Sequence, residues 1–165
     1  MILTSIIFAE AALLSGKRAV QSQMYGPEAR GGSCCGETII SSGDIWFSKL
    51  EHPDLLLALS QEALDQYAGR VRRGGTVLFD AELKAPQSAP GVRFIRLPVL
   101  YVAREEVKNP ITANIVAAGA INAVLGLFPD AVLKEAVRRH VPARTEQLNL
   151  TALEAGRQLG LQTAA

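Results

Sequence analysis

The stretch Asp54–Asp80, DLLLALSQEALDQYAGRVRRGGTVLFD, decides the fold class. It opens with the compact apolar run Asp54–Leu59, which is typical of a strand buried on both faces. Ser60 can cap the free amides of a following helix. Residues 70–75 end that helix, and residues 76–80 read as a second buried strand. Apolar strands spaced by a helix are the mark of a parallel α/β sheet.

The rest of the chain extends this pattern. A helix is predicted at 3–14, strands at 19–23, 34–40 and 92–99, and further helices at 101–107, 112–125, 129–140 and 145–159. No internal repeat is visible. Together these elements predict one α/β domain over residues 1–165, with an open, mostly parallel Rossmann-like sheet flanked by helices and a helical C-terminal part. The strand pair around Tyr25 leaves room for a hairpin or mixed pairing.

Composition excludes several classes of protein. Apolar residues make up 48% of the 165 residues, charged residues 20%, and the net charge is +1, so neither nucleic acid nor a membrane is expected as a partner. The apolar N-terminal segment 1–14 lacks the basic region of a signal peptide and is too short to cross a bilayer. Cys34 and Cys35 have no metal-site spacing, which favours a buried thiol over a zinc or iron–sulfur site and predicts a cytoplasmic protein.

One loop has a sequence that no helix or strand needs. Its residues are Tyr25, Gly26, Pro27, Glu28, Ala29, Arg30, Gly31 and Gly32. Proline stiffens the backbone, and the three glycines permit positive φ angles and a close approach to main-chain N–H groups. In parallel sheets ligands gather at the carboxyl ends of strands, which is where this loop is expected. The loop is therefore a candidate ligand-facing segment, and an ordinary solvated turn is the alternative.

The chain shows no complete catalytic constellation. His52 and His140 are expected on the surface, and no nucleophile elbow, zinc-binding helix or phosphate-binding loop is present. Asn109 and Asn114 flank the start of the long helix at 112–125, where they either face a ligand or cap the helix. Small residues in this helix would let another helix lie close.

A second unusual segment is Asp44–Phe47, which holds the chain's single tryptophan beside a phenylalanine. In a monomer this pair would belong to the rim of the core. In an assembly it would provide interface anchors.

These motifs resemble those of one family, the gamma subunit or gamma domain of the 2-oxoacid:ferredoxin oxidoreductases, which act on pyruvate, 2-oxoglutarate, ketoisovalerate or indolepyruvate. The resemblance covers nearly the whole chain. It is carried by Tyr25–Gly32 above all, and also by Ala9–Ala12 with Gly16-Lys17, Asp54–Leu59 with Ala63–Asp65, Gly74-Gly75, Asn109-Pro110, Ala113-Asn114 and Gly119-Ala120.

The resemblance implies a role in the CoA-dependent oxidative decarboxylation of a 2-oxo acid to an acyl-CoA, with reduction of ferredoxin. It also implies that thiamine diphosphate, Mg²⁺ and the iron–sulfur clusters are held by alpha, beta and ferredoxin-like subunits, and that this chain binds no cofactor alone. The Tyr25–Gly32 loop would then lie at the shared active-site region, at a subunit interface or on the CoA access route. The rival hypothesis is a stand-alone α/β module that binds a nucleotide or CoA.

One feature departs from the family. Its members usually open with a strand and a Gly-rich turn of the form Gly-x-Gly-Gly-Gln-Gly, whereas this sequence opens with the helix that should follow them. The resemblance therefore predicts a gamma-type domain that is truncated at its N-terminus, with the first strand and the Gly-rich turn missing. Such a chain should be poorly stable without its partners.

Overall fold

The parallel sheet predicted from Asp54–Asp80 is present. The computed structural model describes residues 1–25, 34–86 and 90–163. Its three-stranded sheet contains β3 (Leu55–Ala58), β4 (Thr76–Asp80) and β5 (Arg93–Leu97), parallel and in that order. Helix α2 (Gln61–Tyr67) joins β3 to β4, and its first turn is capped by Ser60, whose Oγ accepts the N–H of Ala63 at 3.3 Å. Successive residues of β4 alternate between two apolar clusters, so the sheet is buried on both faces.

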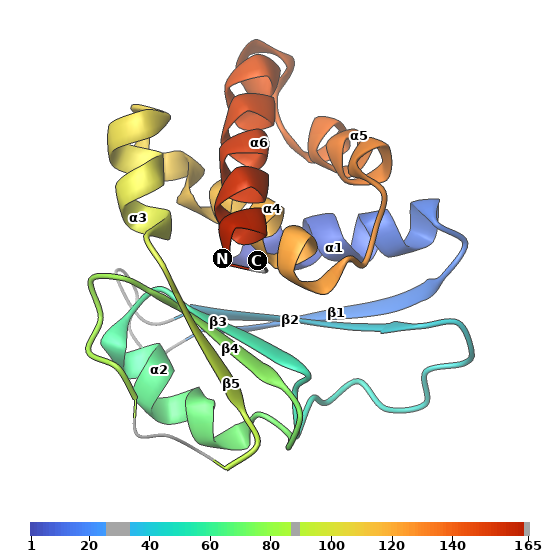
Figure 1. Ribbon diagram of the computed structural model, residues 1–165. Helices are drawn as coiled ribbons and strands as arrows, with labels where there is room; N and C mark the ends of the chain where they lie inside the picture. The colour runs from blue at the N-terminus through green and yellow to red at the C-terminus, as the bar shows by residue number, and fades with distance from the viewer. Residues whose placement is uncertain (26–33, 87–89, 164–165) are drawn as a thin grey trace.

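Helices cover the two faces of this sheet unequally (Figure 1). Helix α2 packs below it, around Leu64, Val77 and Phe79. The other face, with Leu78 and Leu97, belongs to the main core under the C-terminal helices. The α/β class, the parallel strands and the surrounding helices are therefore confirmed.

The two edges of the sheet differ in their side chains. The edge strand β5 carries exposed Arg93 and Arg96, and such charges discourage pairing with another chain. The opposite edge strand β3 carries Leu55, Leu56 and Leu57, which are only half-buried. These leucines contact apolar clusters on both faces of the sheet, as expected, but their burial is incomplete because β3 pairs with β4 alone in the described part of the chain.

The strands around Tyr25 form a separate sheet. Strands β1 (Arg18–Tyr25) and β2 (Cys34–Ser41) pair with each other in antiparallel register, and Tyr25 lies opposite Cys34. The Tyr25 loop therefore joins the strands of a hairpin, and the prediction that it follows a strand of the parallel sheet was wrong. Polar residues and half-buried positions along both strands suit a two-stranded ribbon with one covered face. The hairpin alternative left open by the sequence is confirmed.

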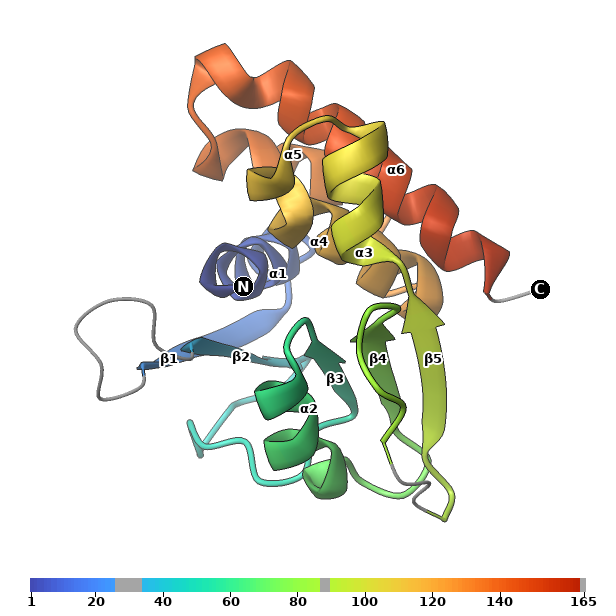
Figure 2. The same ribbon diagram turned by 90° about the vertical axis from the view of Figure 1, so that its left-hand side faces the viewer.

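Helix α1 (Ile2–Leu14) covers that hairpin (Figure 2). The Oγ1 of Thr38 in β2 donates to the carbonyl of Ser5 at 2.8 Å. Gly36 of β2 also faces Ser5 of the helix, and a Cβ added to Gly36 would lie 2.5 Å from the Oγ of Ser5. The helix therefore lies so close to the strands that a larger residue at position 36 would displace the side chain of Ser5.

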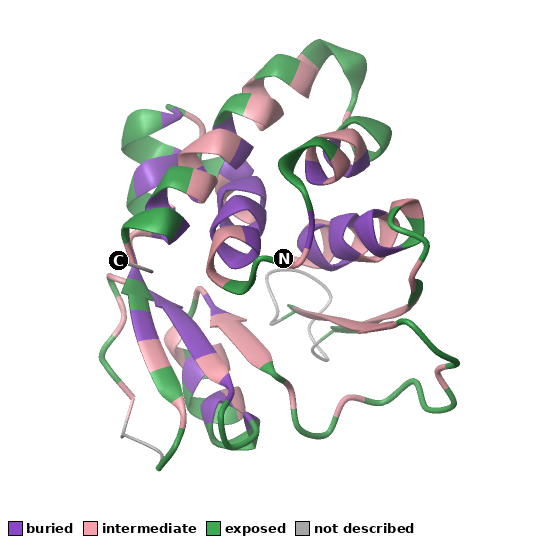
Figure 3. Cartoon of the chain, turned by 45° about the vertical axis from the view of Figure 1, so that its right-hand side comes forward, coloured by how far each residue is buried: buried purple, intermediate pink, exposed green. Residues whose placement is uncertain are grey.

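The C-terminal part is helical, as predicted. It contains α3 (Val99–Tyr101), a π-helical turn (Val102–Glu106), α4 (Ala113–Leu125), α5 (Asp130–His140) and α6 (Glu146–Gln162). The short helix expected at 101–107 is thus found as α3 plus the π-helical turn. Helix α4 ends at Gly126, which has φ 62°, and it is the most deeply buried helix of the group (Figure 3).

Helices α4 and α6 cross with their backbones in contact. A Cβ added to Gly156 of α6 would lie 1.9 Å from the carbonyl oxygen of Val116, and one added to Gly119 of α4 would lie 2.1 Å from that of Leu153. Such distances are far below van der Waals contact, so both positions require glycine. The expectation that the small residues of α4 let another helix lie close is confirmed, with α6 as that helix.

Candidate functional site

The described part of the candidate loop is its base. Gly26, Pro27, Glu28, Arg30, Gly31 and Gly32 lie outside the described residues. Tyr25, the last residue of β1, has 69% of its surface exposed. Its hydroxyl donates to Oε1 of Gln23 at 2.7 Å. The base of the loop is thus held by strand pairing and by a side chain two residues earlier.

A chain of polar side chains continues from this base to the first turns of α1. Nε2 of Gln23 lies 3.4 Å from Oε1 of Gln21, and Nε2 of Gln21 donates to Oγ of Ser5 at 3.0 Å. Residues 21, 23 and 25 share one face of β1 because side chains alternate along a strand. The sequence did not single out these glutamines, because their role depends on the contact of Gln21 with Ser5 of α1.

Asn114 lies at the same end of α1. Its carbonyl accepts a hydrogen bond from Oγ1 of Thr4 at 2.8 Å, and Thr4 is buried. Its side-chain Oδ1 accepts the N–H of Ile115 at 2.9 Å. The structure therefore links the start of α4 to α1, and through Ser5 and Gln21 to the hairpin that carries Tyr25.

Asn109 caps a turn of helix. Its Oδ1 accepts the N–H of Ile111 at 3.1 Å, and its carbonyl accepts from Oγ1 of Thr112 at 2.7 Å. The capping alternative thus describes Asn109, at the start of a short 3-10 turn before α4. The preceding residue, Lys108, has φ 60°, a left-handed conformation that is uncommon outside glycine.

The two cysteines are less buried than expected. Cys34 is exposed and Cys35 is half-buried, which contradicts the buried-thiol interpretation. As neighbours on β2 they point to opposite faces of the hairpin. Burial, reinforced by the nearby Glu37, raises the pKa of the Cys35 thiol, so this thiol stays protonated at neutral pH. The Cys35 thiol therefore lacks the low pKa of a reactive nucleophile. The opposite directions of Cys34 and Cys35 prevent joint ligation of a cluster.

Both histidines lie on the surface, as predicted. Nδ1 of His52 lies 3.3 Å from the carbonyl of Arg70, and Nε2 of His140 lies 3.4 Å from a carboxylate oxygen of Glu10. Neither contact places an imidazole near Tyr25 or Asn114. Among the described residues, no group of three or more His, Cys, Asp or Glu side chains could hold a metal ion.

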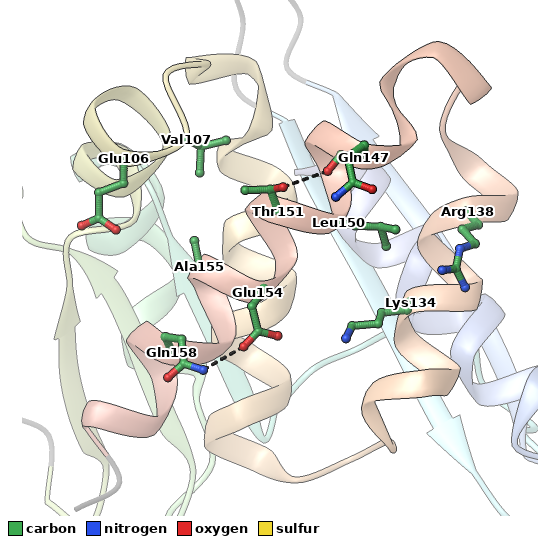
Figure 4. Close-up of a pocket in the computed structure, with 10 residues that line it drawn as sticks. All are labelled: Glu106, Val107, Lys134, Arg138, Gln147, Leu150, Thr151, Glu154, Ala155 and Gln158. Atoms are coloured by element: carbon green, nitrogen blue, oxygen red, sulfur yellow. Dashed lines mark hydrogen bonds between the residues drawn. The ribbon is translucent and has the colours of Figure 1, made fainter.

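A groove of about 690 Å³ lies among α5, α6 and the π-helical turn (Figure 4). Lys134 and Glu154 face each other across it, and Gln158 donates to Glu154 at 2.7 Å. The hydrogen bonds from Gln158 and then from Arg157 lower the pKa of Glu154, which therefore stays ionised and is no general acid at neutral pH. No residue singled out from the sequence lines this groove, and it offers no reactive pair.

Comparison with known proteins identifies the family. The family model described as pyruvate ferredoxin/flavodoxin oxidoreductase matches residues 1–159. The 2-oxoglutarate synthase subunit KorC of Methanocaldococcus jannaschii is 40% identical over 159 residues, which are 94% of this chain and 85% of that relative. The ketoisovalerate oxidoreductase subunit VorA of Methanothermobacter marburgensis is 33% identical over 156 residues, which are 92% of this chain but 32% of that relative.

A solved structure agrees with these relatives in fold. The gamma subunit of a keto/oxoacid ferredoxin oxidoreductase from Geobacter sulfurreducens superposes with a TM-score of 0.83 at 39% identity, covering 98% of this chain and 91% of that one. The resemblance inferred from the Tyr25 motif is confirmed. The chain belongs to the pyruvate ferredoxin/flavodoxin oxidoreductase family, as a gamma subunit of a 2-oxoacid:ferredoxin oxidoreductase.

Proposed function

We propose that the enzyme served by this gamma subunit acts on 2-oxoglutarate. The observation that carries the proposal is the KorC match, which spans nearly all of both chains, and KorC is a subunit of a 2-oxoglutarate synthase. The VorA match has lower identity and spans a third of that protein. In this reaction 2-oxoglutarate loses CO₂, the remaining succinyl group is transferred to CoA to give succinyl-CoA, and two electrons pass to ferredoxin.

The chemistry of this reaction is assigned to partner subunits. Mg²⁺ takes oxygen ligands and iron–sulfur clusters take cysteine thiolates. We expect alpha and beta catalytic subunits and a ferredoxin-like subunit of the same complex to supply these ligands and to bind thiamine diphosphate. The described helices include none long and apolar enough to cross a membrane, and a cytoplasmic complex is the proposed setting.

The Tyr25–Gly32 loop is the part of this chain proposed to reach the shared active site. The loop starts at Tyr25 on β1. Hydrogen bonds from Tyr25 through Gln23 and Gln21 to α1 hold that starting position in place. The positive charge of Arg30 suits the phosphates of CoA, and Gly31 and Gly32 allow main-chain N–H groups near an anion. Asn114 is the described residue on the same side that we propose faces the ligand.

Purification from the native cells tests this function. We expect the tagged chain to bring down subunits that contain thiamine diphosphate and iron–sulfur clusters, and the complex to reduce ferredoxin with 2-oxoglutarate and CoA. Its kcat/KM for 2-oxoglutarate should exceed those for pyruvate and ketoisovalerate by at least about tenfold, the ratio set by roughly 1.4 kcal/mol of transition-state binding. A complex that prefers another 2-oxo acid would refute the substrate, whereas a chain recovered alone that binds CoA would favour the stand-alone module.

A further inference from the structure

The two most exposed aromatic side chains of the described residues are adjacent in sequence. Trp46 is 83% exposed and Phe47 is 82% exposed, on the connection between β2 and β3. The interpretation of this pair as the rim of the core was therefore wrong. Exposing two large rings to water is unfavourable, and paired exposed aromatics mark contact surfaces more often than chance positions do.

The connection that carries these rings is attached to the hairpin. Arg18, the first residue of β1, forms an ion pair with Asp44, and the N–H of Gly43 donates to Oγ of Ser41 at 3.0 Å. Ile45, between Asp44 and the rings, is half-buried. The rings thus project from an anchored segment, which lowers the entropy lost when they are immobilised by a partner.

A hollow of about 380 Å³ adjoins Trp46. It is lined by Ala19, Val20 and Ile45, with the ion-paired side chains of Arg18 and Asp44 at its margin. An aromatic anchor beside an apolar hollow with a charged margin is the arrangement found at the centres of protein interfaces. The hollow gives a partner's apolar side chain a place to enter next to the ring.

The family relatives indicate which partner covers this surface. The domain makes up 32% of VorA, so in that protein it is covalently joined to a much longer polypeptide, whereas it forms most of KorC. A contact made within one chain in VorA must then be made between chains where the domain is a separate subunit. We propose that Trp46 and Phe47 are the anchors by which this gamma subunit docks on the catalytic polypeptide of its complex, an inference that rests on the partners proposed above.

The two rings alone are too small for a stable interface, so their partner must cover more of this face. Two aromatic rings bury roughly 300–500 Å² at about 150–250 Å² each, well below the roughly 800 Å² per partner of a stable interface. A large partner can extend along β1, which spans about 23 Å from Arg18 to Tyr25 at about 3.3 Å per residue. It would then cover Trp46 at one end of the strand and exposed Tyr25 at the other.

Titration of the catalytic subunits tests the docking surface. The subunits are purified without this chain, identified by their bound thiamine diphosphate, and titrated with the wild-type chain and with a Trp46→Ala/Phe47→Ala double variant. The dissociation constant should rise at least about thirtyfold in the double variant, as expected for loss of a hot spot, and less in Trp46→Phe, which keeps an aromatic ring. The control Tyr101→Ala/Leu161→Ala removes two other exposed apolar side chains and should leave the constant unchanged.

The outcomes separate this inference from the proposed function. If the wild-type chain binds the catalytic subunits and the double variant binds equally well, only the docking surface is refuted. If the double variant abolishes self-association of the chain and leaves subunit binding intact, the surface belongs to a second copy and the proposal is overturned. Absence of binding by the wild-type chain would refute both. Thermal unfolding of each variant, expected at the wild-type midpoint, shows that altered binding does not come from misfolding.

Discussion

Replacing Gly156 by alanine is expected to separate helices α4 and α6 and to destabilise the protein by about 2–4 kcal/mol, in the upper range for overpacked cores. The new methyl group would lie 1.9 Å from the carbonyl oxygen of Val116 and 2.7 Å from its carbonyl carbon. These are backbone atoms of a buried helix, so no side-chain rotation relieves the clash. Alanine is the better helix former by about 1 kcal/mol, which offsets only part of the cost.

Thermal unfolding measures this effect. A loss of that size corresponds to a fall in the melting midpoint of roughly 4–16 °C for a protein of this length. Gly69→Ala is the matched control, since Gly69 also lies in a helical turn and an added Cβ there meets nothing within 4 Å. It should change stability by less than about 0.5 kcal/mol. Equal midpoints for the two variants would show that the α4–α6 crossing is looser than described.

The second large effect is expected at Arg30, on activity. In the assembled enzyme, Arg30→Ala should raise the KM for CoA and lower kcat/KM about ten- to a hundredfold, because a hydrogen bond between charged groups contributes about 1.5–3 kcal/mol. The subunits should still assemble. Steady-state kinetics with CoA as the varied substrate, on complexes of verified composition, provide the measurement.

Arg72→Ala serves as the control for charge removal. Arg72 pairs with Asp54 on the exposed surface near the parallel sheet, and such pairs contribute at most about 1 kcal/mol to stability. Its replacement should leave the kinetics with CoA unchanged. If the Arg30 variant forms a complete complex with normal kinetics, the loop has no role in CoA binding and is an ordinary solvated turn.

Local signals explain which elements could be predicted from sequence. The aliphatic run of 76–80 needs burial on both faces, Ser60 caps α2, and Gly126 ends α4. These choices depend on residues within a few positions of each other, so the sequence carries them directly. Gly119 was likewise visible among the small residues of the helix at 112–125, whereas Gly156 of α6 was not singled out.

Features that depend on distant neighbours could not be read in this way. The run at β3 has the composition of a central strand, but its edge position follows from which strands pair with it. The chain of Gln21 and Gln23 needs α1 beside it, and polar residues in a strand otherwise indicate only a solvent-facing side.

Asp80 shows the same limit. In the sequence it is simply the last residue of a strand, whereas the structure buries it completely. Its carboxylate accepts the backbone N–H of Glu82 at 2.9 Å and that of Leu100 at 2.8 Å. It thereby joins the end of β4 to the start of α3, a contact between segments that lie 20 residues apart.

A structure of the purified complex tests the central claim most directly, namely that this gamma subunit contributes a loop and no reactive group of its own to an active site shared with other subunits. Electron cryomicroscopy of the complex with CoA bound should show the Tyr25–Gly32 loop against another subunit, with Arg30 directed toward the CoA phosphates. A loop that points into bulk solvent, away from every subunit and from CoA, would contradict the claim.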